Sequence, residues 1–148
     1  MGETKELANL RSKTERFMRE VTKTYSVVDD RYRIQHESTA LFIEPVDLGE
    51  ERTILRMRAV VLAGVPRRGN DSMFEEFSVL NNRYIFGKLY WVPTEDDGSE
   101  GIIFLEHNFL GEMLDFEEFV AGVVTLSSTS DELDDKLQSK YGGRRWVD

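Results

Sequence analysis

The pattern of apolar and polar residues predicts three amphipathic helices. Apolar residues recur at three- and four-residue steps over residues 4–24, in the segment that begins at Ser72, and from Asp115 to Tyr141. This is the spacing of one helical face, so each segment is expected to direct one side at a core. In the second segment the stripe consists of Phe74, Phe77, Leu80, Asn81 and Tyr84.

Polar motifs predict where two of these helices begin and where the last one is interrupted. Ser72 with Glu75, and Asp115 with Glu118, have the three-residue spacing of a capping box. Residues 127–130 read Ser-Ser-Thr-Ser, which are poor helix formers because their hydroxyls compete for backbone hydrogen bonds. We therefore expect a bend or a break in the third helix at this run.

Between the first two helices, alternating apolar and polar residues predict three strands. Residues 32–46 contain two short strands that are broken near residues 36–38, and residues 52–65 form a third. Residues 25–30, just before them, are expected to be a turn or a short strand.

The chain is expected to change from helix to strand at Gly87. Residues 88–93 are aromatic and branched, as is typical of strands, and residues 102–109 follow after an Asp97-Gly98 turn. The short loop favours antiparallel pairing of these two strands. The resulting order is α-β-β-β-α-β-β-α, which predicts an α+β fold with a single antiparallel sheet of about five strands and helices packed on one face.

Composition indicates one folded domain over residues 1–148, with a short flexible tail at residues 143–148. The chain has no cysteine, which excludes disulfides and thiolate metal sites. A net charge of −9 opposes binding to a phosphate backbone, so no nucleic-acid partner is expected. The N-terminus is polar and charged and no apolar run reaches membrane-spanning length, so we expect no signal peptide, no membrane partner and a cytoplasmic location.

Few residues suggest catalysis or metal binding. His36 and His107 are the two histidines, and His107 follows Glu106 directly. Adjacent strand residues point to opposite faces, so Glu106 and His107 are not expected to share a site. The acidic loop at 95–100 lacks the ligand spacing of an EF-hand, and the acidic run at 131–135 is expected to be a solvated helix face. We therefore predict no catalytic residue, no metal and no cofactor.

Polar residues near the central helix are candidates for binding. Asn81 and Asn82 could hydrogen-bond the backbone of a bound peptide, although we favour a role in capping the helix end or bonding the turn at Gly87. Arg67-Arg68 and Arg144-Arg145-Trp146 are basic spots that could bind a phosphate or a carboxylate. For the second spot, a flexible tail is the favoured interpretation.

Apolar strand residues are candidates for a contact with another protein. Leu89, Trp91, Ile103 and Leu105 alternate along the last two strands. On an uncovered face of the sheet they would form an apolar interface, whereas beneath the helices they would belong to the core. The sequence leaves both possibilities open.

The second half of the chain resembles a known family. The matching segments are 80–82, 86–90, 103–107, 114–118 and 131–137. Over roughly residues 72–142 they resemble the YbjN-type branch of the type III secretion chaperone-like fold, a group of bacterial proteins described loosely as sensory-transduction regulators. The resemblance implies a small acidic homodimer that holds an extended segment of a partner protein and has no established catalytic site.

Three hypotheses follow from these observations. The first is a non-catalytic, chaperone-like or regulatory domain that binds a partner protein as a homodimer. The alternative is a regulatory domain that senses a small ligand near Arg67-Arg68, and the third is a small enzyme that uses His36 or His107. The candidate partner-binding residues are Leu89, Trp91, Ile103, Leu105, Arg67 and Arg68.

Overall fold

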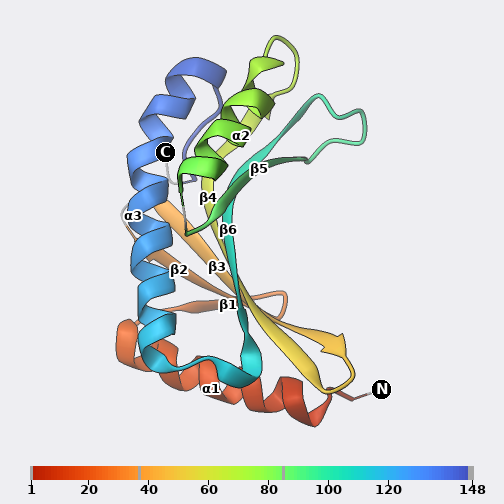
Figure 1. Cartoon of the computed structure of the whole chain (residues 1–148), viewed down its shortest axis with the longest axis vertical. Helices are drawn as coiled ribbons and strands as arrows, with labels where there is room; N and C mark the ends of the chain where they lie inside the picture. The colour runs from red at the N-terminus through yellow and green to blue at the C-terminus, as the bar shows by residue number, and fades with distance from the viewer. Residues whose placement is uncertain (1, 37, 85, 147–148) are drawn as a thin grey trace.

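The computed structural model describes residues 2–36, 38–84 and 86–146. Within them the chain forms one antiparallel sheet of six strands, in the order β1-β2-β3-β4-β6-β5, together with three α-helices (Figure 1). The elements are α1 (Lys5–Val21), β1 (Ser26–Val28), β2 (Arg31–His36), β3 (Thr39–Gly49), β4 (Arg52–Pro66), α2 (Ser72–Arg83), β5 (Lys88–Pro93), β6 (Glu100–Leu110), the 3-10 turn η1 (Gly111–Met113) and α3 (Phe116–Tyr141).

The α+β fold expected from the sequence is confirmed, with one more strand than expected. Residues 26–28 lie in the segment interpreted as a turn or a short strand, and they pair with β2 at the edge of the sheet. The remaining strands follow the predicted order. No helix of the described segments is long and apolar enough to cross a membrane.

The helix starts agree only in part with the predicted capping boxes. Asp115 caps α3, because its side chain accepts from the Glu118 amide at 2.8 Å. The Ser72 prediction is wrong, because α2 is preceded by Asp71 in helical conformation and has no side-chain cap. A capping side chain acts from an extended residue outside the helix, whereas Ser72 is already in its first turn.

The buried stripe of α2 is shifted slightly from the prediction. Met73 is fully buried, although it was not part of the predicted stripe, while Phe74 remains 37% exposed. Phe77 and Leu80 are buried as expected.

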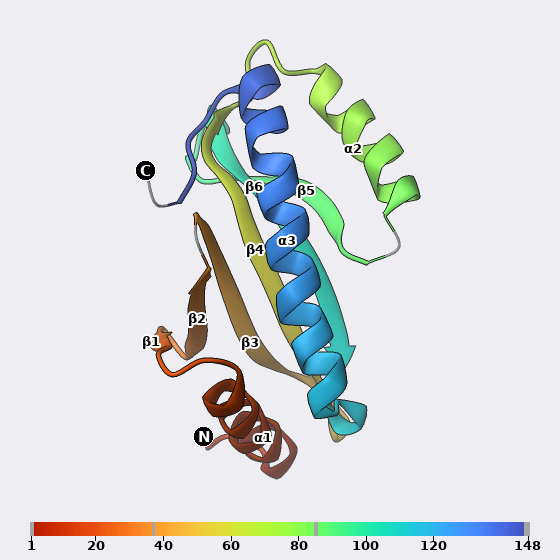
Figure 2. The ribbon, with the colours of Figure 1, turned by 90° about the vertical axis from the view of Figure 1, so that its left-hand side faces the viewer.

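Of the bend or break predicted in α3, the break is wrong, since one helix runs from Phe116 to Tyr141. Ser127 and Ser130 are buried, and their small side chains allow close packing on the core. Ser128 donates a hydrogen bond back to the Val124 carbonyl at 2.6 Å. Packing along the sheet therefore outweighs the weak helix propensity of this run. Figure 2 shows α3 running along β4 and β6.

Gly87 is where the chain passes from α2 to β5, as predicted. Its φ is +91°, a conformation that residues with a side chain rarely adopt. A β-carbon there would also lie 3.0 Å from a methyl of Leu105 and 3.1 Å from one of Leu126. Both the turn and the close packing beneath α3 therefore require glycine.

The segment after α3 is fastened to the sheet in the part that the structure describes. Arg144 and Ala63 exchange two backbone hydrogen bonds of 2.8 Å. β3 pairs with β4 only as far as Val60, so Arg144 occupies the position beside β4 that β3 leaves vacant. This contact lies within the segment 143–148 for which a flexible tail is predicted, and residues 147–148 lie outside the described residues.

Candidate functional site

The two faces of the sheet are built differently. Ile43, Met57 and Leu105 point to one face and are fully buried beneath the helices. The three helices lie on that side of the sheet, and the opposite side has no helix over it (Figure 1). We call this opposite surface the open face and define it by its partly exposed residues: Arg31, Arg33, Phe42, Glu44, Arg56, Arg58, Tyr90, Phe104 and Glu106.

Strand register brings charged residues together at the centre of the open face. Arg58 stands directly opposite Phe42 on β3 and Glu106 on β6. Arg56 and Arg58 lie 3.9 and 3.7 Å from the Glu44 carboxylate, and both lie 3.9 Å from that of Glu106. These separations exceed the usual N–H···O hydrogen-bond length. The four side chains therefore attract one another without close hydrogen bonding.

Glu106 is hydrogen-bonded more tightly by two neutral neighbours. The Tyr90 hydroxyl donates to it at 2.6 Å and the Asn108 amide at 3.0 Å. Burial, together with this bond to Glu106, raises the pKa of Tyr90 to about 12, although nearby Arg58 acts in the opposite direction. The Nε atom of Arg56 is buried and has no hydrogen-bond partner. The open face thus contains a guanidinium donor that the described residues do not use.

Aromatic rings surround these charges. The guanidinium of Arg58 lies over the Phe104 ring at 4.8 Å, and that of Arg31 lies over the Phe42 ring at 5.5 Å. The Trp146 ring packs edge-on against Phe42 at 5.6 Å. Such alternation of rings and cations can contact apolar and charged groups of a bound molecule at the same time.

Three of the candidate partner-binding residues belong to the core. Leu89 is 3% exposed, and Ile103 and Leu105 are fully buried on the helix-covered face. The structure thus selects the core among the two possibilities that the sequence left open. Trp91 is only partly buried, and its indole N–H donates to the Val65 carbonyl at 3.1 Å.

The two arginines proposed for ligand binding lie before α2. Arg67 pairs with Asp71 at 2.6 Å, and its guanidinium lies over the Phe74 ring at 4.7 Å. Phe74 in turn packs against Trp91, which links Arg67 to that candidate. Arg68 is exposed. The structure therefore does not join the two arginines to the three buried strand residues in one site.

His107 lines a hollow together with Glu118, and His36 is not among the residues around it. His107 stacks on Phe86 at 3.9 Å and packs against Phe109. Burial, and secondarily the charge of Lys88, lowers the pKa of His107. His36 is exposed at the end of β2. Among residues 2–36, 38–84 and 86–146, no group of three or more metal-ligating side chains of the His, Cys, Asp and Glu type occurs.

The acidic run at 131–135 is not entirely a solvated face. Asp134 is 4% exposed and lies 3.2 Å from the Arg145 guanidinium. The Ser38 hydroxyl lies within hydrogen-bond distance of both Asp131 and Asp134. Asp134 therefore ties α3 to the β2–β3 connection and to the C-terminal segment.

Asn81 binds peptide backbone, but the backbone is that of its own chain. Its amide donates to the Leu89 carbonyl at 3.0 Å and accepts from the Leu89 N–H at 2.7 Å. A neighbouring strand would make the same two bonds, so Asn81 covers part of the outer edge of β5. We had favoured a role in capping the helix end or in bonding the turn at Gly87. The contacts of Asn81 with Leu89 are neither of these.

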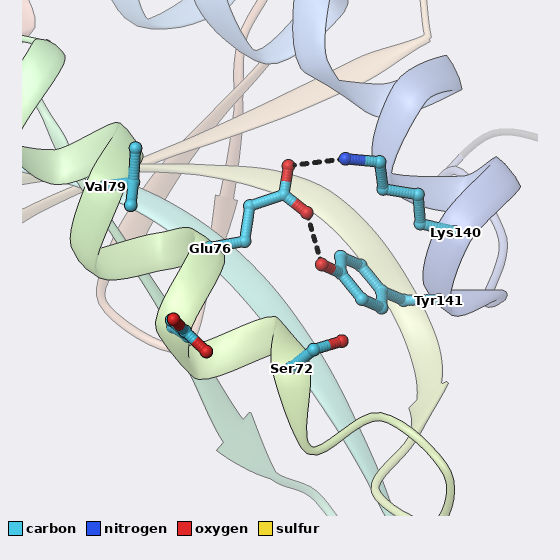
Figure 3. Close-up of a pocket in the computed structure, with 6 residues that line it drawn as sticks. Ser72, Glu76, Val79, Lys140 and Tyr141 are labelled. Atoms are coloured by element: carbon cyan, nitrogen blue, oxygen red, sulfur yellow. Dashed lines mark hydrogen bonds and ion pairs between the residues drawn. The ribbon is translucent and has the colours of Figure 1, made fainter.

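A hollow of about 530 Å³ lies between α2 and the end of α3 (Figure 3). The Glu76 carboxylate is 2.8 Å from the Lys140 ammonium and accepts from the Tyr141 hydroxyl. Desolvation would raise the pKa of Glu76, but the bonds from Lys140 and Tyr141 lower it overall. These contacts bridge the two helices, so the polar groups shown in Figure 3 have a structural role.

The open face was not identified from the sequence. Its signal is the two-residue repeat of charge along strands, as in Arg31 and Arg33 or Arg56 and Arg58. Residues at that spacing share one face of a strand.

Comparison with known proteins places this architecture in a family. Residues 8–148 match the family described as T3SS (YopN, CesT) and YbjN peptide-binding chaperone 1, or TY-Chap1. No curated protein matches the chain.

Solved structures share the fold at low sequence identity. YbjN from E. coli is 9% identical with a TM-score of 0.64, and the match covers 88% of this chain and 93% of that one. A chain of the HopA1–SchA chaperone–effector complex is 15% identical with a TM-score of 0.56, covering 87% and 97%. A chain of the ExsC–ExsE complex is 15% identical with a TM-score of 0.58, covering 90% and 96%.

Proposed function

The chain belongs to the TY-Chap1 family of peptide-binding chaperones, and from this membership we propose that it holds a segment of a partner protein on the open face. The observation that carries the proposal is a sheet with one face covered by helices and the other bearing partly exposed rings and charges. A surface of this composition is typical of protein interfaces, in which aromatic residues and arginine are enriched.

The open face would hold the segment by non-covalent contacts alone. Phe42 and Phe104 supply apolar area, and the arginines beside them supply hydrogen-bond donors. No step of this function requires a nucleophile, a metal or a cofactor.

The outer edge of β5 is less suited to bind the segment than the open face is. Asn81 already occupies the outward N–H and C=O groups of Leu89. β5 ends at Pro93, which has no N–H to donate. An added strand would find few backbone groups along this edge.

Photo-crosslinking from the open face tests the proposal. Benzoylphenylalanine in place of Phe104 keeps an aromatic ring on the open face, and the same residue in place of Val79 on α2 is the matched control. Val79 is 55% exposed and lies on the other side of the molecule, at the α2–α3 hollow. Irradiation in cells should join a partner polypeptide at position 104 and not at 79. Equal crosslinking at both positions, or crosslinking at 79 alone, would contradict the proposal.

We also propose that the chain forms a homodimer through α3. Val124 is 58% exposed and lines an apolar hollow together with Phe116, Val120 and Ala121. An exposed apolar helix surface of this kind is suited to burial against a second copy. Light scattering should give twice the chain mass for the parent and the single-chain mass for Val124→Glu. The same dimeric mass for both would exclude this surface.

A further inference from the structure

We infer that the segment held on the open face is acidic, with carboxylates at alternate positions. This inference rests on the proposed function and specifies the chemistry of the ligand. It follows from the charge of the open face, from its unused hydrogen-bond donors and from the spacing of its arginines.

The open face is richer in positive charge than the rest of the chain. Four arginines face two glutamates across it, whereas the whole chain has a net charge of −9. Arg31 shares this face with Phe42, over whose ring it lies, and Arg33 is paired with Phe42 in the strand register. No ion pair joins Arg31 or Arg33 to a carboxylate of the described residues. An acidic ligand would therefore be complementary to this surface.

The two glutamates do not satisfy the arginines beside them. Glu106 is bonded to Tyr90 and Asn108, and it approaches Arg56 only to 3.9 Å. Within the described segments, the buried Nε atom of Arg56 has no hydrogen-bond partner. The ion pairs of Arg56 and Arg58 with the two glutamates are 3.7–3.9 Å long, so the exposed parts of these guanidinium groups can form closer bonds to a carboxylate brought by a ligand.

The arginines have the spacing of an extended peptide. Arg56 and Arg58 are two residues apart on β4, and Arg31 and Arg33 are two residues apart on β2. Side chains at that separation on a strand are about 6.7 Å apart. An extended segment with Asp or Glu at every second position places its carboxylates at the same interval. Apolar residues placed among the acidic ones, on the same side of the segment, can meet Phe42 and Phe104.

Three labelled peptides test the charge preference. Each is about ten residues long and has the same leucine and phenylalanine residues, with Glu, Gln or Lys at alternate positions. Fluorescence anisotropy with the full chain should give the tightest binding for the Glu peptide, about tenfold tighter than for the Gln peptide and weakened by added salt.

Paired arginine variants locate the effect. Arg31→Gln with Arg33→Gln should weaken binding of the Glu peptide about fivefold and leave binding of the Gln peptide within twofold. Arg19→Gln with Arg83→Gln removes the same charge from exposed helix positions outside the open face and is the matched control. It should change neither affinity by more than about twofold. Circular dichroism and urea unfolding check that both variants remain folded.

The outcomes separate the inference from the proposed function. The acidic inference is overturned if the three peptides bind equally, if the Lys peptide binds best, or if none binds. It is also overturned if both paired variants lose affinity equally. The proposed function depends instead on the crosslink at position 104. A crosslink there together with equal peptide affinities leaves the function standing and the acidic preference refuted.

Discussion

His107 shows how the surroundings of one side chain make the fold sensitive to pH. It lies opposite the buried Met57 in the sheet and between the rings of Phe86 and Phe109. Burial and the charge of Lys88 lower the pKa of His107 below its ordinary value of 6.5. The unfolded chain therefore takes up a proton at a higher pH than the folded chain does. Stability from the neutral ring is fully present above pH 6.5 and is lost as the pH falls from there through the folded pKa.

We predict that His107→Gln reduces the loss of stability between about pH 7.5 and about pH 5.5. The reason is that the variant has no ring to protonate on unfolding. The measurement is the urea midpoint at several pH values. His36→Gln, which removes an exposed histidine, is the control and should keep the pH dependence of the parent. Parallel curves for the parent and His107→Gln would contradict the prediction.

At the scale of elements, periodicity located the helices and strands because one face of each packs on a single core. Gly87 was recognisable because the spacing of apolar residues changes there. The unbroken course of α3 was not recognisable, since the burial of Ser127 and Ser130 depends on the sheet beneath them. The fixed position of Arg144 depends likewise on the early end of β3, a distant feature of the chain.

The edge of β5 gives a prediction at this scale. Asn81→Ala should lower the free energy of unfolding by about 1–2 kcal/mol, because Leu89 loses both outward hydrogen bonds. It should also increase self-association, because the uncovered edge can pair with another strand. Chemical unfolding and sedimentation measure the two effects. Asn82→Ala changes the exposed neighbouring residue and is the control, which should alter neither the free energy of unfolding nor self-association. Equal effects of the two variants would show that the edge contact is unimportant.

At the scale of the whole molecule, the sequence could not decide which side of the sheet is covered. β4 and β6 carry apolar residues on both faces, such as Ile54 and Phe104 on one and Leu55 and Leu105 on the other. Alternation alone therefore does not distinguish core from surface. Only the packing of helices makes the choice, and it assigned Leu89, Ile103 and Leu105 to the core.

Asp134 joins parts of the chain that are distant in sequence, so its replacement should affect the entire fold. Asp134→Asn should lower the free energy of unfolding by about 1–2 kcal/mol, because it weakens the bond of Arg145 to a buried carboxylate while Asp135 still pairs with that cation. Glu132→Gln, at an exposed position of the same helix, is the matched control and should cost less. Urea unfolding measures both, and a control variant as unstable as Asp134→Asn would refute the assignment.

The uneven distribution of charge also affects how fast an anionic molecule can arrive. At a distance such a molecule meets the net charge of −9, which slows its approach, whereas close to the sheet it meets the four arginines. Ions weaken the distant repulsion first, because the screening length shrinks to about 8 Å at physiological ionic strength. The encounter rate should therefore rise as salt is first added and fall only when the short-range attraction is screened as well.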